Sequence, residues 1–124
     1  MSRDPWQLKV FVLADALVPD VYRATAAFPA EERYALQSQI RRAAVSVVAN
    51  IVEGCARATK ADYVRFVGIA AASAAEARYL VSLAARLELV SQSQSDALVE
   101  RYGHVIRGLQ GLHAALRNIR SNAA

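Results

Sequence analysis

Residues 39–54 read Gln-Ile-Arg-Arg-Ala-Ala-Val-Ser-Val-Val-Ala-Asn-Ile-Val-Glu-Gly and are the strongest indication of the fold. Between Ala43 and Val52 the only polar residues are Ser46 and Asn50. A helix that is apolar around most of its circumference is buried on most sides. On a helix turning 100° per residue, five polar side chains share one arc of about 80°: Gln39, Arg42, Ser46, Asn50 and Glu53. On a buried helix such a stripe needs hydrogen-bond partners or a narrow strip of solvent.

The rest of the chain has the same helical character. It holds 26 Ala against 5 Gly and 3 Pro, and shows little strand-type alternation. Apolar residues recur at helical spacing in four segments, at about residues 7–26, 30–53, 60–89 and 95–119. Because the three breaks are short, successive helices should be antiparallel. We expect an all-α protein, with residues 1–124 forming one domain, an antiparallel up-down-up-down four-helix bundle.

Punctuating residues place the helix ends. Pro29 and two following acids predict that the second helix starts near residue 30, and Gly54 predicts its end. Thr59-Lys60-Ala61-Asp62 resembles a capping box at the start of the third helix. The serine-rich break before the last helix offers Ser93 or Ser95 as its N-cap.

The third helix carries polar residues that match the stripe on the second. Ser73 and Glu76 fall in the middle of its apolar arc, and a buried carboxylate without a partner is costly. An antiparallel turn near Arg57 would place Ser73 opposite Arg42 and Glu76 opposite Gln39. We therefore expect Arg42 to pair with Glu76 in a buried polar network, listed in full as Gln39, Arg42, Ser46, Asn50, Glu53, Ser73 and Glu76. Such a network either fixes helix register or, if it opens to a cleft or subunit interface, binds a ligand.

The net charge of +4 comes entirely from the last helical segment. Residues 1–100 hold 11 basic and 11 acidic side chains, whereas residues 101–124 hold four arginines and no acid: Arg101, Arg107, Arg117 and Arg120. This cluster is a candidate nucleic-acid surface. The simpler interpretation is that cations favour the C-terminal end of a helix.

Other chemistries find little support in the sequence. A di-metal bundle needs Glu-x-x-His pairs on two helices, but His104 and His113 both lie on the last segment and neither follows a Glu at that spacing. We predict no metal, no other cofactor and no small-molecule substrate, since glycine-rich phosphate loops and Ser/His/Asp groupings are also missing. The single Cys55 cannot form an internal disulfide, and we see neither a signal peptide nor a membrane span, so we expect a cytoplasmic protein without membrane contact.

One catalytic pattern is present in weak form. Arg107 and His113 are separated by five residues, which resembles the Arg-x(4–6)-His signature of HEPN ribonucleases, themselves four-helix bundles. On an ideal helix the two side chains would lie about 120° apart. The alternative is a surface arginine and a histidine at the edge of the core.

Taken together, the motifs resemble the bacterial family of 23S rRNA gene intervening-sequence proteins, which also includes accessory proteins of diversity-generating retroelements. The matching residues span nearly the whole chain: Tyr22-x-x-Thr25-x-x-Phe28-Pro29, Glu32-x-Tyr34-x-Leu36, Gln39 to Ser46, Asn50-Ile51-x-Glu53-Gly54, Arg57, Tyr63, Phe66, Ile69-Ala70 and Ser73-x-x-Glu76. Three positions depart from the family pattern. Val48-Ala49 stands where a proline often precedes the Asn, Val52 replaces an alanine, and Leu87-Glu88-Leu89 lacks the usual glycine.

The resemblance implies a homo-oligomer, by family analogy a pentameric ring or barrel, with RNA or a reverse-transcriptase-like protein as partner. We therefore expect a non-enzymatic, homo-oligomeric helical-bundle binding or scaffold protein that contacts RNA or an RNA-handling enzyme. The alternatives are a HEPN-like ribonuclease and a purely structural protein-protein interaction module.

Overall fold

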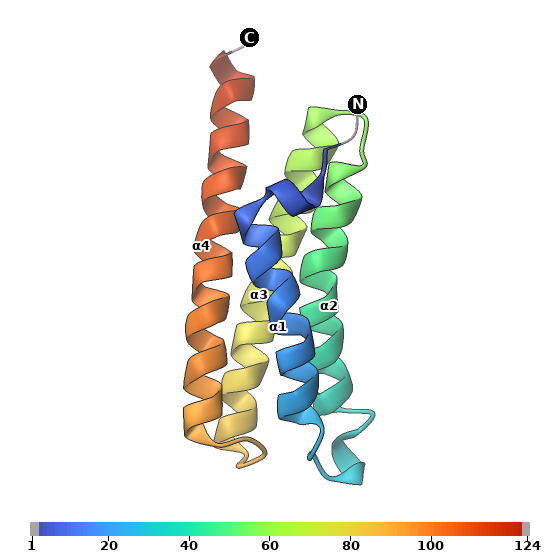
Figure 1. Cartoon of the computed structure of the whole chain (residues 1–124), viewed down its shortest axis with the longest axis vertical. Helices are drawn as coiled ribbons and strands as arrows, with labels where there is room; N and C mark the ends of the chain where they lie inside the picture. The colour runs from blue at the N-terminus through green and yellow to red at the C-terminus, as the bar shows by residue number, and fades with distance from the viewer. Residues whose placement is uncertain (1–2, 123–124) are drawn as a thin grey trace.

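The computed structural model describes the backbone of residues 3–122 and the side chains of residues 3–118. Its four helices are α1 (Lys9–Thr25), α2 (Leu36–Cys55), α3 (Lys60–Arg86) and α4 (Gln92–Asn122). Two short 3-10 turns accompany them, η1 (Pro5–Gln7) before α1 and η2 (Ala30–Glu32) before α2. Residues 3–122 contain no strand, and Figure 1 shows each helix running opposite to the one before it. The prediction of an all-α four-helix bundle is confirmed.

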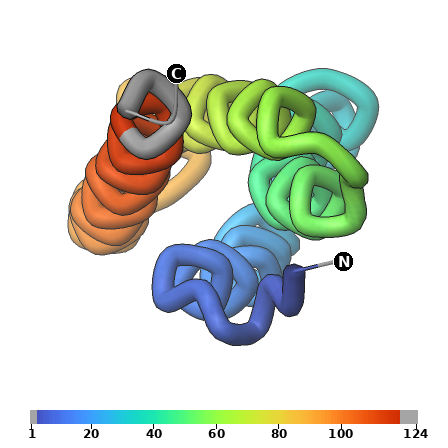
Figure 2. Tube along the Cα trace, turned by 90° about the horizontal axis from the view of Figure 1, so that it is seen from above, coloured from blue at the N-terminus to red at the C-terminus, as the bar shows by residue number. Residues whose placement is uncertain are grey.

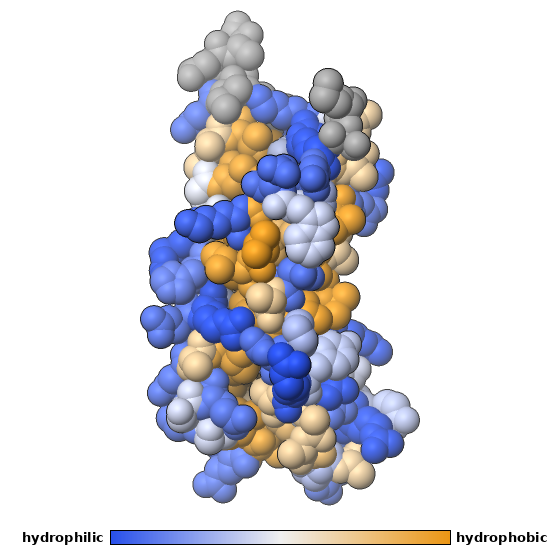
Figure 3. Space-filling model, in the orientation of Figure 1, coloured by the Kyte–Doolittle hydropathy of each residue, from blue (hydrophilic) through white to orange (hydrophobic). Residues whose placement is uncertain are grey.

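The helices surround one core in chain order. Seen from above in Figure 2, α1 and α3 lie at opposite corners, and each packs against α2 and α4. The α4 helix continues well past the start of α1 (Figure 1). On the face shown in Figure 3, hydrophobic surface is visible along the seam between α4 and α1.

Small side chains let α2 and α3 approach closely. The buried residues of these helices include alanines that lie in the centre of the bundle: Ala43, Ala44, Ala70, Ala74, Ala77 and Ala84. Where the end of α2 crosses α3, a Cβ built on Gly54 would come within 2.8 Å of the Cβ of Phe66. Such contacts are tighter than van der Waals packing allows. Gly54 is therefore needed for the close packing of α2 on α3. This role is separate from the helix end that its position in the sequence predicts.

The start of α2 differs from the prediction. We expected a helix from about residue 30, but α2 begins at Leu36, after the η2 turn. Leu36 is the first side chain of this region to be buried, whereas Tyr34 is 90% exposed. Because helices in proteins are stabilised mainly by burial of an apolar face, the segment before Leu36 gains little by continuing the helix.

The loop from α3 to α4 also differs. The α3 helix ends at Arg86 rather than near residue 89, and Glu88 takes the left-handed conformation, with φ 61°. The amide N–H of Leu89 donates to the carbonyl of Ala84, and that of Glu88 to Ala85, which is a Schellman motif. The N-cap of α4 is Ser91, whose hydroxyl accepts from the N–H of Gln94 at 3.0 Å. Neither predicted cap is used.

Buried Ser95 instead donates its hydroxyl to the carbonyl of Val81 at 3.3 Å, which makes it part of the α3–α4 packing. At the other end of α3 the predicted cap is confirmed. The Oγ1 of Thr59 accepts from the N–H of Asp62 at 3.1 Å.

Among the described residues, α3 is long and apolar enough to cross a membrane by length and composition. Helices at the core of water-soluble proteins satisfy the same criterion, and α3 packs against both α2 and α4. The bundle accounts for those apolar residues of α3 that face α2 and α4. That the protein makes no membrane contact stays a prediction.

Candidate functional site

Three of the predicted network residues meet between α2 and α3. The hydroxyls of Ser46 and Ser73 are 2.8 Å apart and hydrogen-bonded. The Nδ2 of Asn50 donates to the carbonyl oxygen of Ser46 at 2.7 Å and approaches its hydroxyl at 3.0 Å. This cluster is uncharged and partly buried, so it links the two helices without the desolvation cost of an ion pair.

The charged members of the predicted network lie elsewhere. The side chains of Gln39, Arg42, Glu53 and Glu76 are exposed, and no ion pair between described residues joins Arg42 to Glu76. Glu53 pairs instead with Arg57 one turn later, at 2.5 Å. The predicted Arg42–Glu76 pairing within the chain is wrong.

The error has a geometric cause. Ser73 faces Ser46, one helical turn further along α2 than the predicted partner Arg42. In addition, α2 and α3 meet at the edge of the bundle. A side chain that lies outside this line of contact, away from the core, reaches solvent. Glu76 is one of these. An exposed carboxylate needs no protein partner.

The outward sides of α2 and α3 carry a second apolar stripe. On α2 the exposed residues Val45, Ala49, Val52 and Ala56 fall within an arc of about 60°, opposite the core. On α3 an arc of about 80° holds five exposed residues: Arg65, Ile69, Ala72, Glu76 and Tyr79. We call these nine residues the outward stripe.

The four arginines predicted on the last helix do not form one patch of unpaired charge. Arg101 donates to Asp20 of α1 at 2.7 Å, and Asp20 also pairs with Arg23 at 2.6 Å. These contacts, first that with Arg101 and then that with Arg23, lower the pKa of Asp20. Arg107 contacts the Nδ1 of His104 at 2.9 Å, and Arg117 is exposed. The side chain of Arg120 lies outside the described residues.

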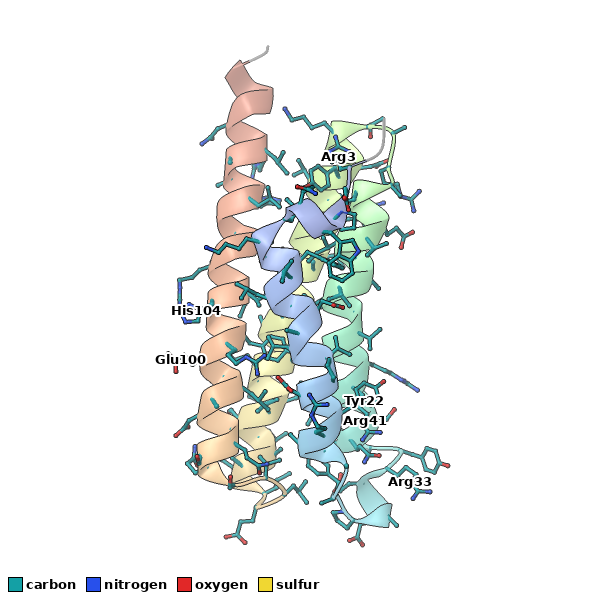
Figure 4. The ribbon with its side chains drawn as sticks, in the orientation of Figure 1. Arg3, Tyr22, Arg33, Arg41, Glu100 and His104 are labelled. Carbon is teal, nitrogen blue, oxygen red and sulfur yellow. The ribbon has the colours of Figure 1, made fainter. Side chains whose placement is uncertain are left out.

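A different basic cluster lies where α1 ends and α2 begins. A surface hollow of about 590 Å³ there is lined by Arg33, Arg41 and Arg42 and by the rings of Tyr22 and Tyr34. Figure 4 shows Tyr22, Arg33 and Arg41 gathered at this end of the bundle, far from Arg3 at the other end. None of the residues that line the hollow is acidic.

The family follows from a comparison with protein-family models. Residues 6–111 match the model described as 23S rRNA-intervening sequence protein. The chain belongs to this family. Solved structures similar to it include a protein of unknown function from the S23 ribosomal protein family of Bacteroides thetaiotaomicron, with a TM-score of 0.78 and 21% sequence identity. The similarity covers 85% of this chain and 95% of that one. No curated protein matches the chain.

For this intervening-sequence protein the comparisons establish the family and the fold. The related structure has the same bundle architecture. The relation to retroelement accessory proteins and the pentameric assembly stay predictions from the sequence.

The HEPN-like pattern is not assembled in the structure of this family member. Arg107 reaches back along α4 to His104, whereas His113 packs against α3, where a Cβ on Gly68 would lie 3.5 Å from its ring. The two side chains thus turn to different neighbours. Among the described residues no group of three His, Cys, Asp or Glu side chains could hold a metal ion. Burial raises the pKa of the Cys55 thiol, which disfavours the reactive thiolate.

Sequence reasoning missed the hollow at the start of α2. Tyr34 was noted only as a family motif residue, and Arg33 was not singled out. Both belong to a segment that was predicted to be helical, and the η2 turn places them beside Tyr22 and Arg41 instead. The available signal was local: residues 33–42 contain three arginines and a tyrosine but no acid.

Proposed function

We propose that this protein is a non-enzymatic scaffold whose copies associate through the outward stripe of α2 and α3. The observation that carries the proposal is the apolar character of this stripe. Val45, Val52 and Ile69 are 39%, 46% and 37% exposed, and alanines separate them. Helices that present apolar residues on two opposite sides are usually covered on both.

The charges of the stripe favour a second copy as the occupant. Within the stripe Arg65 is balanced by Glu76, and beside it Glu53 is paired with Arg57. The surface is therefore close to neutral and contains both signs, so it can be self-complementary, as a symmetric interface requires. A nucleic acid would instead need an excess of positive charge. The family resemblance adds the expectation of a pentamer.

The measurement that tests this function is the mass of the particle in solution. We expect a multiple of the 13.4 kDa chain mass, five chains if the resemblance holds. The Val52→Glu and Ile69→Glu double variant should be monomeric, because it places charges in the centre of the interface. Val12→Glu is a matched control, since Val12 on α1 is 45% exposed but lies outside the stripe.

Circular dichroism must show that all variants remain helical. A wild-type protein that is monomeric at tens of micromolar would contradict the proposal, as would an assembly that survives the double variant. Association that is lost equally in Val12→Glu would place the interface elsewhere.

The scaffold function includes a partner, which the family resemblance suggests is RNA or an RNA-handling enzyme in the cytoplasm. The ribonuclease alternative predicts metal-independent RNA cleavage that is abolished by His113→Ala. It is disfavoured by the separate contacts of Arg107 and His113. A purely structural module would associate as above but bind no RNA.

A further inference from the structure

We propose that the hollow between the end of α1, the η2 turn and the start of α2 binds single-stranded nucleic acid. Three arginines and two tyrosines line it. Guanidinium groups bind phosphate oxygens in paired hydrogen bonds, and aromatic rings stack on unpaired bases. Both kinds of group are needed to hold a flexible strand, and both are present in one hollow.

Arg41 is held ready to bind an anion. Its Nε donates to the hydroxyl of Thr25 at 2.9 Å, and its Nη2 donates to the carbonyl of Tyr22 at 3.1 Å. Its guanidinium also stacks on the Tyr22 ring, 4.4 Å from the ring centre. Thr25 is itself buried and fixed by a bond to the carbonyl of Val21. Since a guanidinium has five N–H donors, three remain for a ligand.

The positive charge of the hollow is not neutralised within the described part of the chain. No ion pair between described residues involves Arg33, Arg41 or Arg42. The carboxylate of Glu32, the nearest acid in sequence, accepts a hydrogen bond from the N–H of Leu36 at 3.3 Å. Asp20 near the end of α1 is occupied by Arg23 and Arg101. Three neighbouring cations without acids attract phosphates strongly at low salt.

Tyr34 provides the surface for a base. Its side chain is 90% exposed at the rim of the hollow, so both faces of the ring are accessible. Stacking of a base on such a ring contributes to affinity with little dependence on sequence. An acidic peptide would use the arginines but gain less from this ring. The aromatic contribution therefore favours a nucleic acid over a peptide.

The site deepens the proposed function by naming what the scaffold would hold. It meets the outward stripe at Val45, with its arginines outside the stripe, and repeated copies would place several such sites on one assembly. Multiple sites on one particle strengthen binding to a long strand without any new contact. The site does not depend on assembly, because all its lining residues come from one chain.

Fluorescence anisotropy with labelled single strands of about twelve nucleotides, both RNA and DNA, tests the site. The Arg33→Ser and Arg42→Ser double variant removes two exposed arginines whose side chains have no hydrogen-bond partner among the described residues. It should weaken binding by about tenfold or more at low salt. The matched control is Arg107→Ser with Arg117→Ser, which removes the same charge from exposed positions on α4 and should change affinity by less than about twofold.

The ring is tested separately. Tyr34→Ala should weaken binding several-fold, and Tyr34→Phe should retain it, because stacking uses the ring and not the hydroxyl. A polyglutamate peptide that binds as tightly as the oligonucleotides, and without dependence on Tyr34, would show that the site is a peptide site. No binding by wild-type protein at low salt, or equal losses in the two double variants, would overturn the proposal.

The mass of each sample separates this inference from the proposed function. A monomeric protein that binds oligonucleotides through Arg33 and Arg42 would contradict the proposed self-association and support the binding site. An oligomer that binds no oligonucleotide would support self-association and contradict the binding site.

Discussion

The hydroxyls of Ser46 and Ser73, 2.8 Å apart, form a side-chain hydrogen bond that crosses from α2 to α3. Around it these helices meet largely through alanine and aliphatic side chains, with Tyr63 and Phe66 packed against the end of α2. A polar contact in a mostly apolar seam favours one register over its neighbours, because sliding by a turn breaks the bond. The Ser46–Ser73 pair therefore sets how α2 and α3 align.

A double-mutant cycle measures this contact. Ser46→Ala and Ser73→Ala should each lower the free energy of unfolding by about 1 kcal/mol, with a coupling energy of about 0.5–1.5 kcal/mol. Chemical denaturation gives all four values. Ser38→Ala is the control, because this serine is also half-buried on α2 but has no described side-chain partner. Additive effects of the two alanines would show that the hydroxyls do not interact.

Much of the fold could be predicted from the sequence because its apolar periodicity is strong. The four segments lie close to α1–α4, and Thr59 caps α3 as expected. Two residues of the polar stripe on α2 do form hydrogen bonds. Ser46 bonds to Ser73 on α3, and Asn50 bonds to Ser46 within α2. Periodicity gives the direction of each side chain from its own helix axis, which is enough for these statements.

The charged part of the network could not be predicted, because periodicity does not give the offset between two helices. A shift of one turn separates the expected partner of Ser73 from the observed one. Periodicity also does not indicate whether a residue near the contact between two helices faces the core or the solvent, as the exposed Glu76 shows. The basic hollow depends on how η2 folds back beside α1, a tertiary feature with no periodic signal.

Replacing Glu88 by glycine should stabilise the protein. Glu88 has φ 61°, and its N–H and that of Leu89 close the Schellman motif at the end of α3. A side chain other than glycine costs about 1 kcal/mol in this conformation. We expect Glu88→Gly to raise the free energy of unfolding by up to about 1 kcal/mol. Glu88→Ala retains the Cβ and removes the charge, so an equal gain in both variants would attribute the effect to the carboxylate.

Tyr102 is buried at the centre of the bundle, and its hydroxyl has no hydrogen-bond partner among the described residues. Burial raises the pKa of this phenol. An unsatisfied buried hydroxyl costs about 1–3 kcal/mol, so Tyr102→Phe should leave stability unchanged or increase it. Thermal unfolding measures the effect. Tyr102→Leu should destabilise through the lost ring volume, and a loss of stability in Tyr102→Phe as well would show that the hydroxyl is bonded after all.

Asp20 should make the bundle sensitive to acid. It accepts hydrogen bonds from Arg101 of α4 and Arg23 of α1, which lower its pKa below the unfolded value, the Arg101 contact more than the Arg23 contact. In the unfolded chain Asp20 therefore takes up a proton at a higher pH than in the folded chain. Its contribution is complete above the unfolded pKa, about 3.9, and is lost as the pH falls through the lowered folded pKa.

Unfolding free energies measured from neutral pH to below about pH 3.5 should thus fall less steeply for Asp20→Asn than for the wild type. The side chains are about one-third exposed, so the difference should be under about 1 kcal/mol. Arg101→Leu should remove more of the pH dependence than Arg23→Leu, because Arg101 has the larger effect on the Asp20 pKa. Equal slopes in wild type and Asp20→Asn would mean that the contact between α1 and α4 does not hold in solution. A larger effect of Arg23→Leu would assign the lowered pKa to the contact within α1.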